Sequence, residues 1–380
     1  MEVITAYAVL KIVWWILLGV LLAGLAIMVG MDMGVGTLLR FVGRNDDERR
    51  ICLNAIGPHW DGNQVWFILG GGAIFAAFPL IYATAFSGLY IVMLLLLWTM
   101  IVRPLGFEYR SKLTSPTWRN AWDWALLVSG AVPMIIYGAA MGNMLKGVPF
   151  HFEWDMRSFY TGSFLSLLNP FAVLCGLMSL SLSIYMGGVM LMGRAGGDIA
   201  RRSRSAAMGA AAVAMVLFTI GGLWVSRLSG FVLVHSPDPA VAQNPLQQSV
   251  SLASGAWHAN YHAHPLLWAV PVLGYAGLLL GLLAVRAGRH TLAWWLGAVA
   301  WIGVIGTVGV SLFPFLMPSS EVPSQSLTVW NSISSQTTLL WATGFALVFV
   351  PLVVWYTSWA FWVMRGEVDA RAMLNDDHAY

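Results

Sequence analysis

The chain has 380 residues, of which 58% are hydrophobic and only 10% charged, with a formal net charge of +3. Soluble domains carry roughly 25% charged residues, so the composition excludes a water-soluble globule and indicates an integral membrane protein. The basic residues are few and grouped by loop, which does not suggest nucleic-acid binding. The two cysteines, Cys52 and Cys175, are far apart and cannot form a disulfide framework or a Cys-rich metal site.

Nine apolar stretches are close to the ~20 residues that a membrane helix needs. The first has no basic region before its long apolar run, so we expect a span rather than a signal peptide. A short turn at Ala85–Ser87 separates the second stretch from the third. The chain is therefore predicted to be a single polytopic domain, residues 1–380. The predicted spans are residues 8–34, 65–84, 86–107, 122–143, 163–190, 207–227, 266–285, 292–316 and 338–364.

Lysine and arginine fall mainly on one side of these spans. All but four of the 20 basic residues follow spans 1, 3, 5, 7 and 9, and the exceptions are Lys11, Lys146, Arg157 and Arg227. The positive-inside rule makes the basic side cytoplasmic. We therefore expect a multi-pass protein whose N-terminus is outside and whose C-terminus is in the cytoplasm.

A compact polar cluster stands directly before the second span, formed by His59, Trp60, Asp61, Asn63 and Gln64. His and Asp are costly at membrane depth and need a partner or a function there. The spacing of Asp61 and Gln64 fits a capping box, in which the carboxylate accepts free backbone N–H groups. The alternative is a proton-carrying carboxylate at the mouth of the helix bundle. The spacing leaves both interpretations open, and one residue can serve both.

Two further ionisable residues are expected at the same membrane level. Asp32 lies about two turns before Arg40, between Gly30 and Gly34, whose spacing permits close helix contact. It either forms an interhelical hydrogen bond or belongs to a proton relay. Arg103, at the end of span 3, either extends to lipid headgroups or forms an ion pair that keeps a carboxylate ionised.

The remaining candidates are interpreted mainly as structural. Trp66 follows the polar cluster by about one turn and is expected to pack or to lie at the interface. Asp123 follows Arg119 by four residues, which predicts an interfacial ion pair. A haem held by two histidines needs both at membrane depth, and His59 has no second histidine in a span. We therefore predict no haem ligand and no metal site in this chain.

Sequence blocks spread over nearly the whole chain carry a family resemblance. In this order they closely resemble subunit II of the cytochrome bd-type quinol oxidases. The blocks are GMDMGVGTLLRFVGRNDDERR from Gly30, GPHWDGNQVW from Gly57, AAFP from Ala76, YATAFSG from Tyr82, RPLGFEYRSK from Arg103, WRNAWDW from Trp118, LLNPF from Leu167, FPFLMPSS from Phe313, SLTVW from Ser326 and SSQTTL from Ser334.

The resemblance implies an all-α integral membrane protein of nine transmembrane helices, arranged as two four-helix bundles plus one peripheral helix. It implies a respiratory complex of the bacterial cytoplasmic (inner) membrane that oxidises quinol, reduces dioxygen to water and generates a proton motive force without pumping. Two haems b, haem d and the quinol site would belong to subunit I, the partner. This chain would ligate no cofactor and would not be catalytic alone. Small single-span accessory subunits and a structural quinone remain open.

The resemblance also implies roles for two residues. Asp61 corresponds to a carboxylate assigned to a cytoplasmic proton path, and Trp66 to a tryptophan near a hydrophobic route for dioxygen. Two other classes compete with this assignment. A secondary transporter is disfavoured because most spans lack charge and no matching pair of interrupted helices is visible. A purely structural partner without a proton role is not excluded by any residue of the sequence.

Overall fold

The computed structural model describes residues 6–368; Arg371, His378 and both chain ends lie outside this range. The helices are α1 (Ala6–Val42), α2 (Asp46–Ile56), α3 (Trp60–Ala77), α4 (Pro79–Gly88), α5 (Tyr90–Tyr109), α6 (Pro116–Lys146), α7 (Pro170–Arg194), α8 (Gly197–Val225), α9 (Ala259–Ala263), α10 (Ala269–Arg286), α11 (His290–Leu312) and α12 (Gln336–Val363). Three antiparallel two-stranded sheets pair β1 (Phe150–Phe152) with β2 (Ser158–Tyr160), β3 (Ser229–His235) with β4 (Ser249–Ser254), and β5 (Phe315–Met317) with β6 (Leu327–Thr328).

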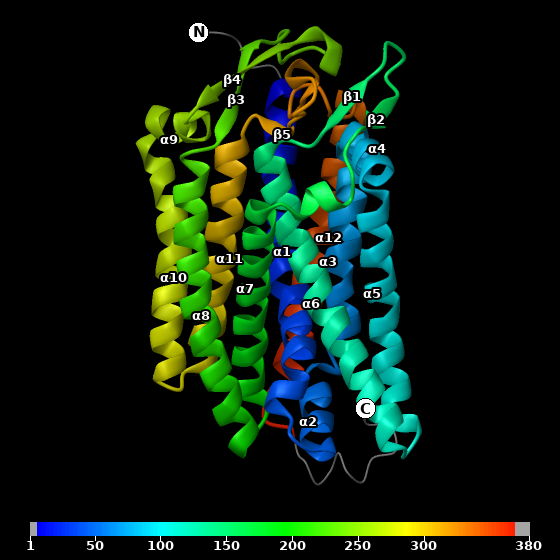
Figure 1. Ribbon diagram of the computed structural model, residues 1–380, viewed down its shortest axis with the longest axis vertical. Helices are drawn as coiled ribbons and strands as arrows, with labels where there is room; N and C mark the ends of the chain where they lie inside the picture. The colour runs from blue at the N-terminus through cyan, green and yellow to red at the C-terminus, as the bar shows by residue number, and fades with distance from the viewer. Residues whose placement is uncertain (1–5, 369–380) are drawn as a thin grey trace.

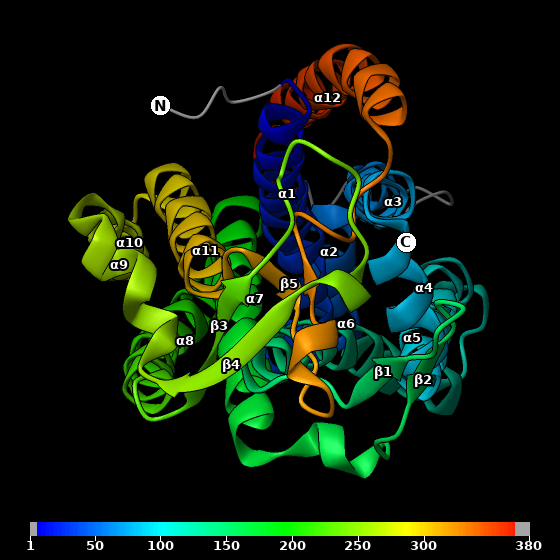
Figure 2. The same cartoon turned by 90° about the horizontal axis from the view of Figure 1, so that it is seen from above.

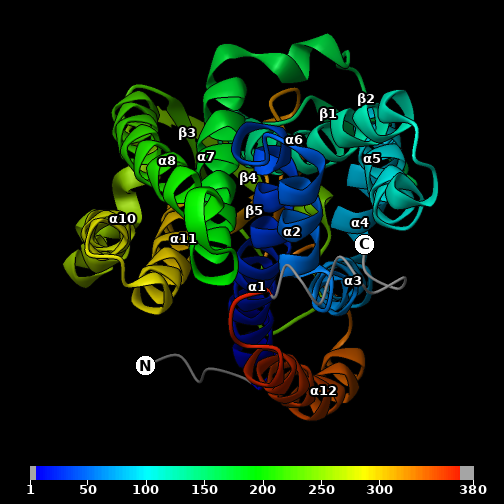
Figure 3. The ribbon, with the colours of Figure 1, turned by 90° about the horizontal axis from the view of Figure 1, so that it is seen from below.

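The expected all-α membrane architecture is confirmed for the described residues. Eight helices are long and apolar enough to cross a bilayer, and the bent pair α3 and α4 supplies a ninth candidate. Helices α1, α3, α5 and α6 pack into one four-helix bundle, and α7, α8, α10 and α11 into a second. Both α1 and α6 contact α7, which joins the bundles, while α12 lies at the edge against α3 and α1 (Figures 2 and 3).

The junction between the bundles depends on small residues. A Cβ atom on Gly34 of α1 would collide with the Ser183 carbonyl of α7, and one on Gly187 would collide with the Gly34 backbone. The Ser183 hydroxyl also donates to the Gly30 carbonyl at 2.5 Å. The close contact predicted from the Gly30 and Gly34 spacing is therefore confirmed, and it brings the α1 backbone directly against α7.

The predicted second span, residues 65–84, is wrong in shape. The helix breaks at Phe78, and α3 and α4 form an angle of 114°. Pro79 causes the break because it lacks an N–H group and forces the preceding residue out of helical geometry; Phe78 has φ −127° and ψ 61°. The turn expected at Ala85–Ser87 lies inside α4 instead.

A neighbouring loop satisfies the carbonyl groups that the break frees. The Ser334 N–H donates to the Ala77 carbonyl at 2.8 Å, and the Ser334 hydroxyl donates to the Ala76 carbonyl at 2.6 Å. At the other end of α12, the Val368 N–H donates to the Arg194 carbonyl at 2.8 Å. These bonds matter because unsatisfied backbone groups are costly in a bilayer.

Two span ends also differ from the prediction. Helix α7 begins at Pro170 rather than at residue 163, because the Asn169 side chain caps it by accepting from the Ala172 N–H. Helix α11 ends at Leu312, and Phe315–Met317 forms β5 instead of continuing the helix.

The two ends of the molecule differ in structure (Figure 1). The end that holds α2, the short 3-10 helix η1 (Arg110–Lys112) and the loops between α7 and α8 and between α10 and α11 is called the Arg-rich end. The opposite end carries β1 to β4 and is called the hairpin end.

Candidate functional site

A carboxylate–guanidinium pair, called the Asp32 pair, is closed inside the first bundle. Asp32 of α1 lies 3.4 Å (Oδ2 to Nη2) from Arg103 of α5, and their residues are 1% and 3% exposed. Asn63, on the first turn of α3, donates from Nδ2 to the same Oδ2 at 2.9 Å. Three helices therefore bring their polar side chains to one buried point. Arg103 does not extend to lipid headgroups, which was one of its two predicted roles.

The Asp32 pair is incompletely hydrogen-bonded. The second carboxylate oxygen of Asp32, Oδ1, and both terminal nitrogens of Arg103 have no hydrogen-bond partner within the described residues. Leaving one buried polar group unsatisfied costs about 1–3 kcal/mol, and more for charged groups. Native proteins retain few such groups, so this pair requires an explanation beyond packing.

Asp61 does not form the predicted capping box. The N-cap position of α3 is His59, without a side-chain capping bond, and Asp61 is already inside the first turn. The Gln64 amide donates to the Trp60 carbonyl at 3.4 Å instead of reaching back to a cap. The physical reason is the turn before α3, which starts the helix two residues too early for Asp61 to cap it. The Asp61 side chain is exposed at the Arg-rich end, where the positive end of the helix dipole favours a carboxylate.

His59 is covered rather than available as a ligand. Its ring stacks on Phe361 of α12 with centroids 4.1 Å apart and planes 5° apart. Burial, followed by the positive charge of Arg194, lowers the pKa of His59 to about 4, so the imidazole is neutral at neutral pH. It is the one buried histidine of the described chain, and residues 6–368 contain no group of three or more metal-ligating side chains. These residues do not fit a haem held by two histidines.

Trp60 of the polar cluster and Trp66, about one turn further along α3, pack against neighbouring helices. Trp60 stacks on Phe107 of α5, with centroids 4.9 Å apart, and the Arg103 guanidinium lies 5.8 Å from the Trp60 ring. Trp66 is 7% exposed and lies against α1 at Gly24, where a Cβ atom would collide with the indole. The packed position expected for Trp66 is therefore the one it occupies.

The predicted pair between Asp123 and Arg119 is wrong. Asp123 is fully buried and accepts from Arg110 Nε at 2.6 Å and from Arg49 Nη1 at 2.8 Å. Arg119 binds Asp46 of α2 at 2.6 Å, and Arg110 also reaches Asp46 at 2.8 Å. Residues of α2 therefore bind Asp123 and Arg119, which the helical spacing had predicted to pair with each other. We call these five residues the Asp123 network.

The sequence analysis missed α2, although a local signal was present. The Asn45 side chain caps α2 by accepting from the Glu48 N–H at 2.8 Å, and Glu48 accepts from the Arg44 N–H at 2.7 Å. An Asn followed three residues later by Glu is a helix-start signature. Glu48 also binds Arg202 of α8 at 2.6 Å, which ties α2 to the second bundle.

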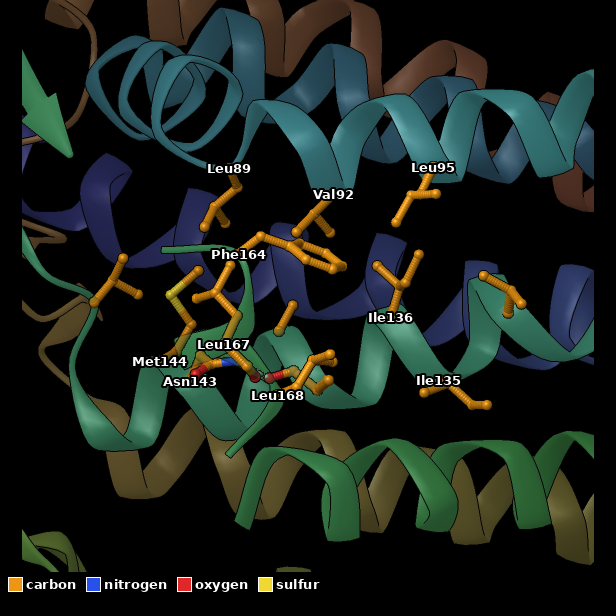
Figure 4. Close-up of a pocket in the computed structure, with 14 residues that line it drawn as sticks. Leu89, Val92, Leu95, Ile135, Ile136, Asn143, Met144, Phe164, Leu167 and Leu168 are labelled. Atoms are coloured by element: carbon orange, nitrogen blue, oxygen red, sulfur yellow. Dashed lines mark hydrogen bonds between the residues drawn. The ribbon is translucent and has the colours of Figure 1, made fainter. Parts of the chain in front are cut away.

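A cavity of about 200 Å³ lies between α5 and α6 (Figure 4). Its lining is apolar except for Asn143, whose amide donates to the Ala139 and Leu167 carbonyls and whose oxygen accepts from Asn169. The cavity therefore offers no free polar group for directional recognition, and none of the predicted site residues lines it.

Comparison with known proteins identifies the family. Residues 10–364 match the family model for cytochrome bd terminal oxidase subunit II. The chain is 45% identical to the cytochrome bd-I ubiquinol oxidase subunit 2 of Escherichia coli (strain K12), over 98% of this chain and 99% of the relative. It is 29% identical to the cytochrome bd ubiquinol oxidase subunit 2 of Bacillus subtilis (strain 168), over 93% of this chain and 96% of the relative.

A solved structure of bd oxidase from Geobacillus thermodenitrificans shares the fold, with a TM-score of 0.67 at 14% identity, over 94% of this chain and 99% of that chain. The chain therefore belongs to the cytochrome bd terminal oxidase subunit II family and is a multi-pass membrane subunit of a bacterial respiratory oxidase.

Proposed function

We propose that this chain supports a haem-bearing subunit I and conducts protons from the cytoplasm toward it, in a complex that oxidises quinol and reduces dioxygen to water. Two haems b, haem d and the quinol site belong to subunit I, and this chain ligates none of them. Because the water-forming protons come from the cytoplasm, the complex generates a proton motive force without pumping.

The placement of two carboxylates carries the proposal. Asp61 is exposed at the Arg-rich end, and Asp32 is buried on the inner side of Asn63, two residues further along α3. The positive-inside rule places the Arg-rich end in the cytoplasm. A proton therefore enters at Asp61 and reaches Asp32. Helix residues are spaced about 3.6 per turn, so Asp61 and Asn63 point to different sides and the proton passes between the carboxylates through water.

We also propose an apolar route for dioxygen through this chain, which the position of Trp66 supports. Its indole is buried between α3 and α1 against Gly24, within the first bundle. Dioxygen is apolar and small, so it partitions into apolar protein and lipid rather than following the charged path. Protons and dioxygen therefore follow different routes. Protons move between the carboxylates, and dioxygen moves along the packed aromatic side chains.

The test replaces each carboxylate by its neutral isostere. We expect Asp61→Asn and Asp32→Asn to assemble with full haem content, since Asn keeps the shape and still accepts a hydrogen bond. Neither variant can release a proton, so quinol-driven oxygen consumption per haem d should fall about tenfold, which corresponds to about 1.4 kcal/mol of barrier. The matched control is Asp47→Asn, an exposed carboxylate of α2 at the same end.

Two results would contradict this proposal. Parent-like oxygen consumption per haem d in both Asn variants would leave the carboxylates with structural roles only. A comparable loss in Asp47→Asn would indicate that surface charge at the Arg-rich end, rather than a defined path, sets the rate.

A further inference from the structure

A fourth polar side chain, that of Tyr137, interacts with the Asp32 pair from α6. Tyr137 of α6 has a buried hydroxyl without a hydrogen-bond partner among the described residues. The hydroxyl lies within electrostatic range of the Arg103 guanidinium. Helix α6 runs antiparallel to α5 (Figure 1), and side chains in a helix point toward its N-terminus. Arg103 therefore extends toward the hairpin end and Tyr137 toward the Arg-rich end, so the two side chains approach each other.

The unpartnered atoms around Asp32 are complementary in kind. Asp32 Oδ1 is an acceptor, the two Arg103 nitrogens are donors, and the Tyr137 hydroxyl can do both. Each such buried group costs about 1–3 kcal/mol when it is left unsatisfied. Buried donors and acceptors of interacting side chains that do not bond each other are typical of a buried water site, because one water makes about three hydrogen bonds.

The surroundings restrict where this water can bind. Trp60 and Phe107 stack on each other, and their ring centroids lie 5.8 Å and 6.0 Å from the Arg103 guanidinium. The other oxygen of Asp32, Oδ2, already accepts from Asn63 and forms the ion pair with Arg103. Water is thus directed to Oδ1, the free guanidinium nitrogens and the Tyr137 hydroxyl.

We propose that Arg103 and Tyr137 hold buried water beside Asp32, and that this water takes the proton onward from Asp32 into the interior of the bundle. The inference rests on the proposed proton-conducting function. In each transfer Asp32 releases one proton to the water and the water passes one proton on; a proton arriving from the Asp61 side then reprotonates Asp32, so the site returns to its starting state. Arginine is not deprotonated in proteins, so Arg103 orients the water without relaying the proton. Tyr137 is a positioning residue that fixes the water through its hydroxyl.

The test uses Tyr137→Phe in the assembled complex, which removes only the hydroxyl. We expect full haem content and oxygen consumption per haem d reduced by about fivefold, below the 10²–10⁴-fold that a positioned proton-transfer group contributes. The solvent isotope effect on turnover should rise, because proton transfer becomes slower relative to the other steps. In a high-resolution electron cryo-microscopy map, water density between Arg103 and Tyr137 should be present in the parent complex and lost in the variant.

Tyr185→Phe is the matched control. Tyr185 is also buried, but its hydroxyl donates to the Ala293 carbonyl at 2.7 Å in the second bundle. That variant loses a hydrogen bond of the fold, and its turnover and isotope effect should stay at the parent values.

The outcomes separate this inference from the proposed function. Slow Asp32→Asn with parent-like Tyr137→Phe overturns the inference and leaves the proton path intact. Parent-like turnover in both variants overturns the proton path and the inference with it. If Tyr137→Phe does not assemble, the parent map decides alone: no water density at Arg103 and Tyr137 overturns the inference.

Discussion

Two buried Asp–Arg sites in this chain are alike in burial and opposite in hydrogen bonding. In the Asp123 network, both carboxylate oxygens of Asp123 accept from guanidinium groups, at 2.6 Å from Arg110 and 2.8 Å from Arg49. In the Asp32 pair, the guanidinium of Arg103 is 3.4 Å away and one carboxylate oxygen has no partner within residues 6–368. Both aspartates are at most 1% exposed, so burial does not distinguish them.

The difference fits a structural role for the Asp123 network and the proposed proton-transfer role for the Asp32 pair. Asp123 is held rigidly because both of its carboxylate oxygens accept charge-assisted hydrogen bonds, and only Arg110 Nη1 among the Arg110 nitrogens has no partner within residues 6–368. A carboxylate that forms a long ion pair and has one oxygen without a hydrogen-bond partner can still accept a mobile proton on that oxygen. These bonds show that the Asp123 network holds α2 and α6 together, and the open oxygen of Asp32 supports the proposed role of the Asp32 pair in proton conduction.

The largest expected effect comes from Asp123→Ala. The change leaves Arg110 buried without its main partner, and breaking a buried ion pair by removing one member costs about 3–5 kcal/mol. We expect little or no assembled complex, measured as haem content per membrane protein. Any complex that does assemble should turn over normally per haem d, because the network lies outside the proton path.

Asp155→Ala provides the control for that prediction. Asp155 binds Arg157 at 2.6 Å, as short as the bond between Arg110 and Asp123, but Arg157 is 68% exposed on the hairpin end. Exposed pairs contribute little, so assembly should be unaffected. Equal losses in the two variants would show that burial does not determine the contribution of these pairs.

Asn63→Ala should have an intermediate effect on both stability and turnover. The substitution removes the 2.9 Å bond to Asp32, and hydrogen bonds to charged groups contribute about 1.5–3 kcal/mol. We expect a lower thermal midpoint together with slower oxygen consumption per haem d, because Asp32 loses its fixed position. Asn120→Ala, which removes an exposed partner of Arg40, should change neither quantity. A loss of stability at parent-like turnover would place Asn63 among the purely structural residues.

Arg119→Ala should have the smallest effect. Arg119 binds Asp46 at the rim of the Asp123 network, where the side chains are 26% and 34% exposed, and Arg110 still holds Asp46 after the change. Partly exposed pairs contribute roughly 0–1 kcal/mol and are screened by salt. The shift in thermal midpoint should be small and should shrink as salt is added. A shift in thermal midpoint that salt does not reduce would show that Arg119 belongs to the buried part of the Asp123 network.

Hydropathy predicted the spans because about 20 apolar residues have few alternatives in a bilayer. It did not predict the break at Phe78, because proline is also tolerated in continuous membrane helices. The partner of Asp123 was misjudged for a related reason. Helical spacing favours the local residue Arg119, whereas the actual partners include Arg49, which α2 brings from a distant part of the chain.

The candidate site was only partly predictable. The sequence placed Asp32 and Arg103 at one membrane level, and it offered an ion pair as one of two roles for Arg103. It could not reveal Tyr137, since a tyrosine in an apolar helix is ordinarily a packing residue and only the structure locates its hydroxyl. The orientation of Asp61 was also hidden, because it depends on the residue at which α3 begins.

The fixed ends of α12 have a consequence for assembly. Along its most apolar stretch only 11% of the residues of α12 are buried. Ser334, just before the helix, nevertheless binds the break between α3 and α4, and Val368, just after it, binds the end of α7. A helix anchored at its ends rather than along its sides can exchange its lateral neighbours without changing position. Helix α12 therefore keeps its position at the boundary of the subunit. Lipid that contacts its exposed sides can be replaced by protein while the rest of the fold stays unchanged.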